Sequence, residues 1–163
     1  MLIRSFLVCV AVCLVALPSA APAQTYGDGF GVGGVLLPSG AGTLLAKTRV
    51  GSSLGLEFAL ALSTYSNGST SSSDFSVGVG ALQHWNTDSQ LQPYLGARVD
   101  IASSSYKFGE TDESDTSFGL FGALGAEYFV TKRLSLEGEA ALGFRFGSFS
   151  MNTGTRLAAL LYF

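Results

Sequence analysis

Apolar and polar side chains alternate along most of this chain in short segments. At the end of the sequence, Leu157, Ala159 and Leu161 fall on one face of an extended strand, and Arg156 and Tyr162 fall on the other. Successive side chains of a β-strand point to opposite faces, so a period of two predicts a strand. About eight such segments are separated by turn-forming residues. We expect strands at residues 30–37, 43–50, 54–63, 74–85, 91–102, 116–130, 134–146 and 153–163.

The connections between these segments alternate in length. Three are short, at residues 51–53, 86–90 and 131–133, and three are longer and polar, at residues 64–73, 103–115 and 147–152. Only the connection at 38–42 breaks the trend. Short turns at one end and long loops at the other are typical of outer-membrane β-barrels, whose short turns face the periplasm. This pattern places both chain ends on the periplasmic side.

Charged side chains gather on one face of the expected strands and are missing from the other. In the strand at 54–63, the leucines and Phe58 share a face, and Glu57 lies on the opposite one. Five cations and five carboxylates share the charged face: Lys47, Arg49, Arg98, Arg145 and Arg156 with Glu57, Asp100, Glu127, Glu137 and Glu139.

This distribution reverses that of a sheet in water, which turns its charges outward and its aliphatic face toward a core. A lysine or arginine at the lipid midplane costs about 2–4 kcal/mol, and an unpaired buried charge is prohibitive. We therefore expect an all-β protein, an antiparallel up-and-down transmembrane β-barrel of about eight strands with its ions enclosed. The alternative, a soluble sandwich or lipocalin-like barrel, would bury the leucine and phenylalanine face.

Eight strands leave a lumen just wide enough for side chains to fill, so we expect a charged network that plugs the interior. Short turns place Lys47 opposite Glu57, as an ion pair, and Glu127 opposite Glu137. The second pair joins like charges, which destabilise the sheet unless an arginine lies between them. The available partners are Arg98, Arg145 and Arg156.

The start of the chain has the composition of a secretory signal peptide. A positive charge precedes an apolar run at 5–17, and Ala21 and Ala23 occupy the small positions of a cleavage site. We expect a signal peptide at residues 1–23 and an outer-membrane barrel domain at 24–163. An amino-terminal membrane anchor is the alternative, but the run is shorter than the roughly 20 residues of a span. Both cysteines fall in the first region, which leaves no disulfide or thiolate metal site after cleavage.

Composition excludes other classes of protein. Cleavage after Ala23 would remove one charged residue, Arg4, and leave 8 basic against 12 acidic residues, a net charge of −4. Nucleic-acid binding requires a basic surface, so we expect no nucleic-acid partner. The mean hydropathy is high, at +0.37, yet no stretch after residue 23 has the apolar length of a membrane helix. The 21 glycines and the abundant serine and threonine favour strand over helix.

Over essentially its whole length after residue 23, the chain resembles the small outer-membrane barrels of Gram-negative bacteria, the OmpA/OmpX type. The resemblance rests on the barrel pattern, the exported start and the final residues Leu161, Tyr162 and Phe163. It implies a monomer in the cell outer membrane, in contact with outer-membrane lipid and lipopolysaccharide. It also implies insertion by the barrel assembly machinery, which would recognise the terminal aromatic Phe163. The glycines at 31, 33 and 34 interrupt the alternation and leave the strand count at the N-terminal end open.

Few residues in the sequence suggest catalysis or cofactor binding. Gly29, Gly31 and Gly34 match the spacing of a dinucleotide-binding loop, but no strand precedes them and no helix follows. We expect them to make room for bulky neighbours or to allow the strand to coil sharply. His84, the only histidine, is expected as a girdle or pore-end residue beside Trp85 at the periplasmic end, the wrong side for lipid A chemistry. Two aromatic girdles are expected: Trp85, Tyr128 and Phe163 near one rim, and Phe75, Phe118, Phe144 and Phe146 near the other.

One expected loop is acidic and contains Glu110, Asp112, Glu113 and Asp115. These carboxylates could hold Ca²⁺ or Mg²⁺ between lipopolysaccharide phosphates, but their spacing fits no twelve-residue calcium loop, so solvated loop charge is the simpler interpretation. We expect no catalytic, cofactor-binding or metal-binding residue. The pattern favours a structural or surface-interaction role, without enzyme activity, in which the long loops make the contacts. A narrow porin-like channel is the first alternative, and a lipid-modifying outer-membrane enzyme is the second.

Overall fold

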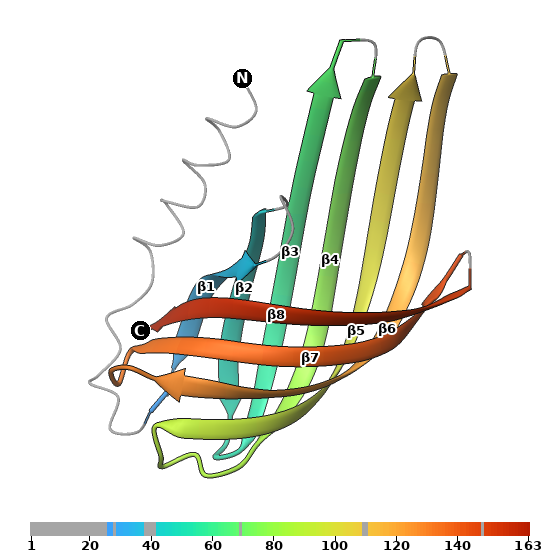
Figure 1. The fold of residues 1–163 in the computed structure, drawn as a ribbon. Helices are drawn as coiled ribbons and strands as arrows, with labels where there is room; N and C mark the ends of the chain where they lie inside the picture. Colours follow the sequence, from blue (N-terminus) through green and yellow to red (C-terminus); the bar gives the residue numbers. More distant parts are fainter. Residues whose placement is uncertain (1–25, 28, 38–41, 69, 109–110, 148) are drawn as a thin grey trace.

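Eight antiparallel strands form a closed barrel in the computed structural model, which describes residues 26–27, 29–37, 42–68, 70–108, 111–147 and 149–163. The strands are β1 (Phe30–Leu37), β2 (Gly42–Val50), β3 (Leu54–Asn67), β4 (Thr70–His84), β5 (Leu91–Phe108), β6 (Thr111–Phe129), β7 (Leu134–Phe146) and β8 (Ser150–Tyr162). Each strand pairs with the next, and β1 closes the ring against β8 (Figure 1). The described residues contain no helix long and apolar enough to cross a membrane. The expected fold class is confirmed, and the expected signal peptide lies outside the described residues.

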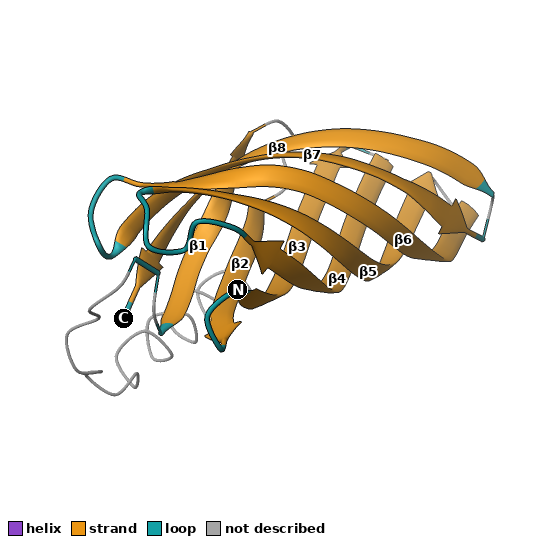
Figure 2. Ribbon diagram, turned by 90° about the horizontal axis from the view of Figure 1, so that it is seen from below, coloured by secondary structure: helices purple, strands orange, loops and turns teal. Residues whose placement is uncertain are grey.

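The strands are tilted because their pairing is staggered around the ring. The row of paired residues that starts at Val32 runs through Ala46, Phe58, Val79, Val99, Leu120 and Phe144 to Met151 on β8. Val32 itself pairs with Leu161, ten residues further along β8. Such a stagger accompanies strand tilt in any closed sheet. Figures 1 and 2 show the consequence, since β7 and β8 cross obliquely over the strands of the opposite wall.

Glycine allows the first strand to approach the last. A Cβ added at Gly31 would lie 2.7 Å from the ring of Tyr162 on β8, which is closer than real contacts allow. Gly33 lies directly over the backbone of β8 at Ala159 and leaves no room for a side chain. The expectation that the glycines make room for bulky neighbours is confirmed for Gly31, whereas Gly34 has only the Thr43 carbonyl oxygen within 4 Å, at 3.4 Å. Gly31 and Gly33 also hold the seam at which the sheet closes.

Apolar and charged side chains lie on the two faces of the sheet that the sequence predicts for them. Leu95, Leu124 and Leu142 point outward and expose between 50% and 61% of their surface. Lys47 and Glu57 are buried in the lumen. Apolar side chains therefore cover the outer wall and charged ones fill the interior. The soluble alternative, which required the leucine face at the centre, is wrong.

Two of the three long loops expected from the sequence are mostly strand. β3 continues to Asn67 and β4 begins at Thr70, while β5 continues to Phe108 and β6 begins at Thr111. The third, expected at 147–152, is shortened because β8 begins at Ser150. The alternation of apolar and polar residues stops where both faces of a strand meet water, so a serine-rich strand looks like a loop in the sequence. The short turns at the other end are confirmed.

These extensions build a sheet that stands above the rest of the barrel. The pairing of β2 with β3 ends at Gly42 and Leu62, and the pairing of β6 with β7 begins at Phe118 and Phe146. Beyond these points only β3, β4, β5 and β6 continue, as a four-stranded sheet that we call the projecting sheet (Figure 1). It comprises residues 63–67, 70–74, 102–108 and 111–117.

Candidate functional site in the barrel interior and at its outer end

Three cations and three carboxylates form an ionic network across the middle of the lumen: Lys47, Arg98 and Arg156 with Glu57, Glu137 and Glu139. Arg156 is its centre. Its Nη2 atom lies 2.5 Å from Glu57 Oε2, 2.5 Å from Glu137 Oε1 and 3.1 Å from Glu139 Oε2. One guanidinium therefore joins carboxylates from β3 and β7.

The other two cations complete the network. Arg98 donates two parallel hydrogen bonds to Glu139, of 2.7 and 2.8 Å, and its Nε lies 2.7 Å from Glu57 Oε1. Lys47 donates to Glu137 and lies 3.6 Å from Glu57, the residue directly opposite on β3. The expected Lys47–Glu57 ion pair is confirmed. Because the charges balance and the carboxylate side chains are at most 2% exposed, the network can be both dry and neutral.

The like-charged pair expected from the sequence is present but is held apart in an unexpected way. Glu127 lies opposite Glu137 in the register, as expected. Glu137 forms ion pairs with Lys47 and Arg156. Glu127 instead accepts hydrogen bonds from the hydroxyls of Ser135, at 2.5 Å, and Tyr162, at 2.8 Å. No described arginine bridges the two carboxylates, so that part of the expectation is wrong. Hydroxyl donors stabilise the second carboxylate instead.

His84 lies inside the lumen at the end with the short turns. It is buried, and its Nε2 lies 3.8 Å from Glu127 Oε2, too far for a hydrogen bond. Its ring packs against Tyr94, with the ring centres 5.3 Å apart. The neighbouring Trp85 points outward and is 47% exposed. The girdle interpretation of His84 is therefore wrong and the pore-end one is correct.

Aromatic rings fill the lumen around the charges. Tyr94 is fully buried and donates a 2.9 Å hydrogen bond to Glu139. A Cβ added at Gly125 would lie 2.5 Å from the Tyr94 ring, so the glycine provides the space that this ring occupies. Nearer the other end, the Phe121 ring lies under the Arg145 guanidinium, 6.0 Å away. The lumen is thus packed with side chains in the way expected for eight strands.

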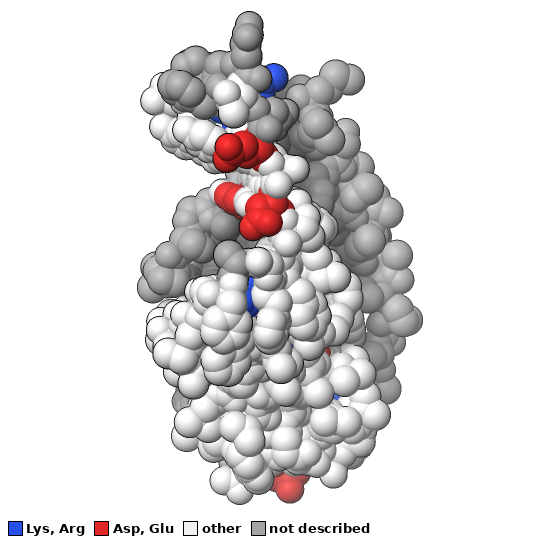
Figure 3. Space-filling view, turned by 90° about the vertical axis from the view of Figure 1, so that its right-hand side faces the viewer, with Lys and Arg blue, Asp and Glu red and all other residues white. Residues whose placement is uncertain are grey.

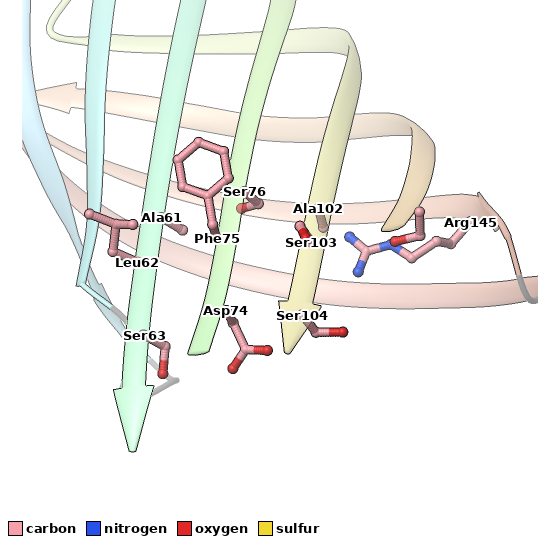
Figure 4. A pocket seen from close by; sticks show the side chains of 11 residues that line it. Ala61, Leu62, Ser63, Asp74, Phe75, Ser76, Ala102, Ser103, Ser104 and Arg145 are labelled. Carbon is pink, nitrogen blue, oxygen red and sulfur yellow. The ribbon is translucent and has the colours of Figure 1, made fainter. Parts of the chain in front are cut away.

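The outer mouth of the barrel holds a separate ion pair and a cavity. Arg145 Nη2 lies 3.0 Å from Asp100 Oδ2, and both side chains are partly exposed. Above this pair is a cavity of about 270 Å³, lined mainly by small and polar side chains. Figure 4 shows Arg145 reaching from β7 toward β5, and Asp74 and Phe75 on opposite sides of β4. The cavity is part of the mouth and ends above the ionic network.

The acidic residues of the expected loop belong to the projecting sheet. Asp112, Glu113 and Asp115 lie in β6, and Glu110 lies outside the described residues. Glu113 and Asp115 line a second hollow together with Tyr106, and Figure 3 shows acidic side chains gathered around a hollow near the upper end. The described residues contain no group of three or more potential metal ligands.

The upper aromatic girdle is confirmed on the outer wall. Phe75, Phe118, Phe144 and Phe146 all point outward and are 41–45% exposed. At the opposite rim Tyr128 and Trp85 are both 47% exposed. Phe163 is half-buried, and its backbone N–H donates a 3.0 Å hydrogen bond to Phe30 O.

The sequence matches one family model, described as an outer membrane protein beta-barrel domain, over residues 9–155. A search of curated proteins found no match.

Several solved structures share the fold. The N-terminal β-barrel domain of OprF from Pseudomonas aeruginosa is 13% identical, with a TM-score of 0.64 over 86% of this chain and 100% of that one. Neisserial surface protein A is 22% identical, with a TM-score of 0.56 over 82% of this chain and 93% of that one. Ail, the attachment invasion locus protein of Yersinia pestis, is 12% identical, with a TM-score of 0.53 over the same shares. At these identities the likeness shows the fold alone.

Proposed function

Because the chain belongs to the family of outer membrane protein β-barrel domains, we propose that it is a plugged, non-enzymatic barrel whose projecting sheet makes contacts at the cell surface. The observation that carries this proposal is the projecting sheet itself. Four strands continue past the last pairing of β2 and past the first pairing of β7. A structure that only crossed the membrane would not need them, because a strand of about 9–11 residues spans a bilayer. β3, β4, β5 and β6 have 14, 15, 18 and 19 residues.

The two edges of the projecting sheet differ, and the difference favours one of them as the contact surface. On the β6 edge, residues 111–117 include three carboxylates, and charged side chains discourage the addition of another strand. On the β3 edge, residues 63–67 are Ser, Thr, Tyr, Ser and Asn, with no charge and no proline. Exposed backbone groups on such an edge can pair with an extended segment of a partner. We place the contact at the β3 edge.

Shortening the two hairpins tests the role of the projecting sheet. Leu62 pairs with Phe75, and Ile101 pairs with Phe118, so each pair can be joined by an Asn-Gly turn. The shortened barrel should still fold, as shown by a heat-modifiable gel shift. Cells that carry it should attach less to each other and to immobilised serum and matrix proteins. Unchanged attachment by the folded, shortened barrel would refute the surface role.

A matched pair of substitutions tests the choice of edge. Thr64 and Thr116 are both exposed threonines of the projecting sheet. Thr64 lies on its β3 edge and Thr116 on its β6 edge. Thr64→Lys should reduce attachment because it places a charge on the edge that pairs. Thr116→Lys should leave attachment unchanged. The reverse result would move the contact to β6, and equal effects would show that no edge is used.

The partners implied by the resemblance are part of the same proposal. The monomer contacts outer-membrane lipid and lipopolysaccharide through its apolar wall, and the barrel assembly machinery inserts it through the C-terminal strand. Deletion of Phe163 should lower the amount of barrel assembled in cells and leave refolding into detergent unchanged. Normal assembly in cells without Phe163 would contradict recognition of the terminal aromatic.

A further inference from the structure

The turn between β7 and β8 carries an aromatic side chain that belongs neither to a strand of the barrel wall nor to the projecting sheet. Phe149 exposes 75% of its surface, the largest value among the exposed large hydrophobic residues that the structure describes. In the sequence it falls in a short polar segment, which favours a loop in water. In the structure its ring lies back against the outer wall of its own hairpin.

The ring of Phe149 belongs to a continuous aromatic cluster. It stacks on Phe144, with ring centres 6.0 Å apart and planes at 15°, and it lies 6.2 Å from Phe146. Phe146 in turn lies 6.2 Å from Phe118 on β6. Met151 pairs with Phe144 across the hairpin and is 65% exposed. We call Phe144, Phe146, Phe149 and Met151 the hairpin cluster.

The backbone of the turn sets this arrangement. Gly147 has a φ of 131°, a conformation that residues with a side chain rarely adopt. The chain reverses there, and Ser150 already pairs with Arg145. Phe149 therefore sits in a short turn, next to the strands, where its ring can reach the wall.

The β3–β4 and β5–β6 hairpins show the opposite chemistry at the same end of the barrel. Past the upper girdle, the outward side chains of β4 and β5 are Ser71, Ser73, Ser105 and Lys107. Their surroundings must be aqueous. The hairpin cluster instead continues the apolar outer wall without a break, through Phe118 and Phe146.

We infer that the β7–β8 hairpin tip inserts into the outer leaflet of the membrane and that Phe149 and Met151 bind lipid acyl chains. The occupant follows from continuity, since the cluster extends the surface that already faces lipid in this family, and aromatic side chains favour the boundary between acyl chains and headgroups. The hairpin is an anchor on one side of the mouth, next to the β6 edge of the projecting sheet. This inference does not depend on the proposed surface role.

Single-tryptophan fluorescence tests the anchor. Trp85 is the only tryptophan, so a Trp85→Phe background allows one reporter at a time. Phe149→Trp and Met151→Trp would be compared with Leu142→Trp, on the lipid-facing wall, and with Tyr106→Trp, on the projecting sheet. Each folded variant would be placed in vesicles of phosphatidylcholine with brominated acyl chains, because bromine quenches tryptophan on contact.

We expect Phe149→Trp to lose fluorescence in brominated vesicles and to shift its emission to shorter wavelength, as Leu142→Trp does. Tyr106→Trp should show neither change. If Phe149→Trp and Met151→Trp both behave like Tyr106→Trp, the hairpin stands in water and the inference is overturned. Quenching of either one at the level of Leu142→Trp supports it, and the heat-modifiable gel shift confirms that each variant is folded.

Discussion

The interior of this barrel depends on one residue more than on any other. Arg156 contacts three carboxylates, while Arg98 contacts two and Lys47 contacts two. Burying a charge is costly unless it is paired, so the removal of a central cation leaves the penalty of its partners in place. The Arg145–Asp100 pair at the mouth is partly exposed, and water can replace a lost partner there.

Replacing the central arginine should therefore destabilise the barrel strongly. Arg156→Leu should lower the free energy of unfolding by about 3–5 kcal/mol, as for a broken buried pair. Urea unfolding of protein folded in lipid vesicles measures this value. Arg145→Leu is the control and should cost clearly less. Equal losses of unfolding free energy for the two variants would mean that water reaches the ionic network as readily as it reaches the mouth.

On the outer face of the barrel, an added charge should be destabilising because this face contacts lipid. Leu124 lies on the outward face of β6 and is 61% exposed to the surroundings of the barrel. Leu124→Arg should cost about 2–4 kcal/mol in lipid vesicles, because arginine is unfavourable near the bilayer midplane. Ser105→Arg, above the girdle and exposed, should be tolerated. A tolerated Leu124→Arg would contradict the assignment of this face to lipid.

At the scale of the strand, glycine positions decide where side chains fit inside the barrel. Gly125 on β6 and Gly138 on β7 have opposite surroundings. A Cβ at Gly125 would meet the Tyr94 ring at 2.5 Å and the Gly138 carbonyl oxygen at 2.7 Å. A Cβ at Gly138 would meet nothing within 4 Å. The first glycine makes space for the lumen, and the second faces outward.

Substitution by valine should separate these two roles. Gly125→Val should prevent or severely weaken folding, because the buried Tyr94 ring cannot move without losing its hydrogen bond to Glu139. Gly138→Val should fold at least as well as the parent, because valine is favoured in strands. The heat-modifiable gel shift of detergent-folded protein distinguishes the outcomes. Normal folding of Gly125→Val would show that the interior is loosely packed.

For the whole molecule, we propose that the ionic network and the lumen aromatics together close the path through the barrel. The network spans the middle, Tyr94 and Tyr162 fill the end with the short turns, and the mouth cavity ends above them. We therefore expect this barrel not to conduct, in contrast to a porin, whose wider ring leaves a channel.

Conductance across planar lipid bilayers tests the plug. The intact barrel should give no current, or rare and small openings. Arg156→Ala combined with Tyr94→Ala should increase the frequency and size of openings, provided that the gel shift shows a folded barrel. A steady, solute-selective current from the intact barrel would contradict the plug and favour the narrow channel.

The sequence alone determined the class of fold, because the period of two and the placement of ten charges on one face depend only on residue order. It also determined the Lys47–Glu57 and Glu127–Glu137 registers, since short turns fix which residues face each other. The projecting sheet escaped detection because strands that have water on both faces lose the alternation that identifies them.

Other features were decided only by tertiary structure. Glu57 on β3 reaches Arg156 on β8 only when the ring is closed, whereas Glu137 lies on β7, the strand next to β8. The hydrogen bond from Tyr162 to Glu127 and the packing of His84 against Tyr94 likewise depend on strands brought together by the fold. The return of Phe149 to the wall depends on the turn of its own hairpin. A periodic pattern specifies the face on which a side chain lies, whereas its partner across the lumen follows from the tilt and stagger of the closed barrel.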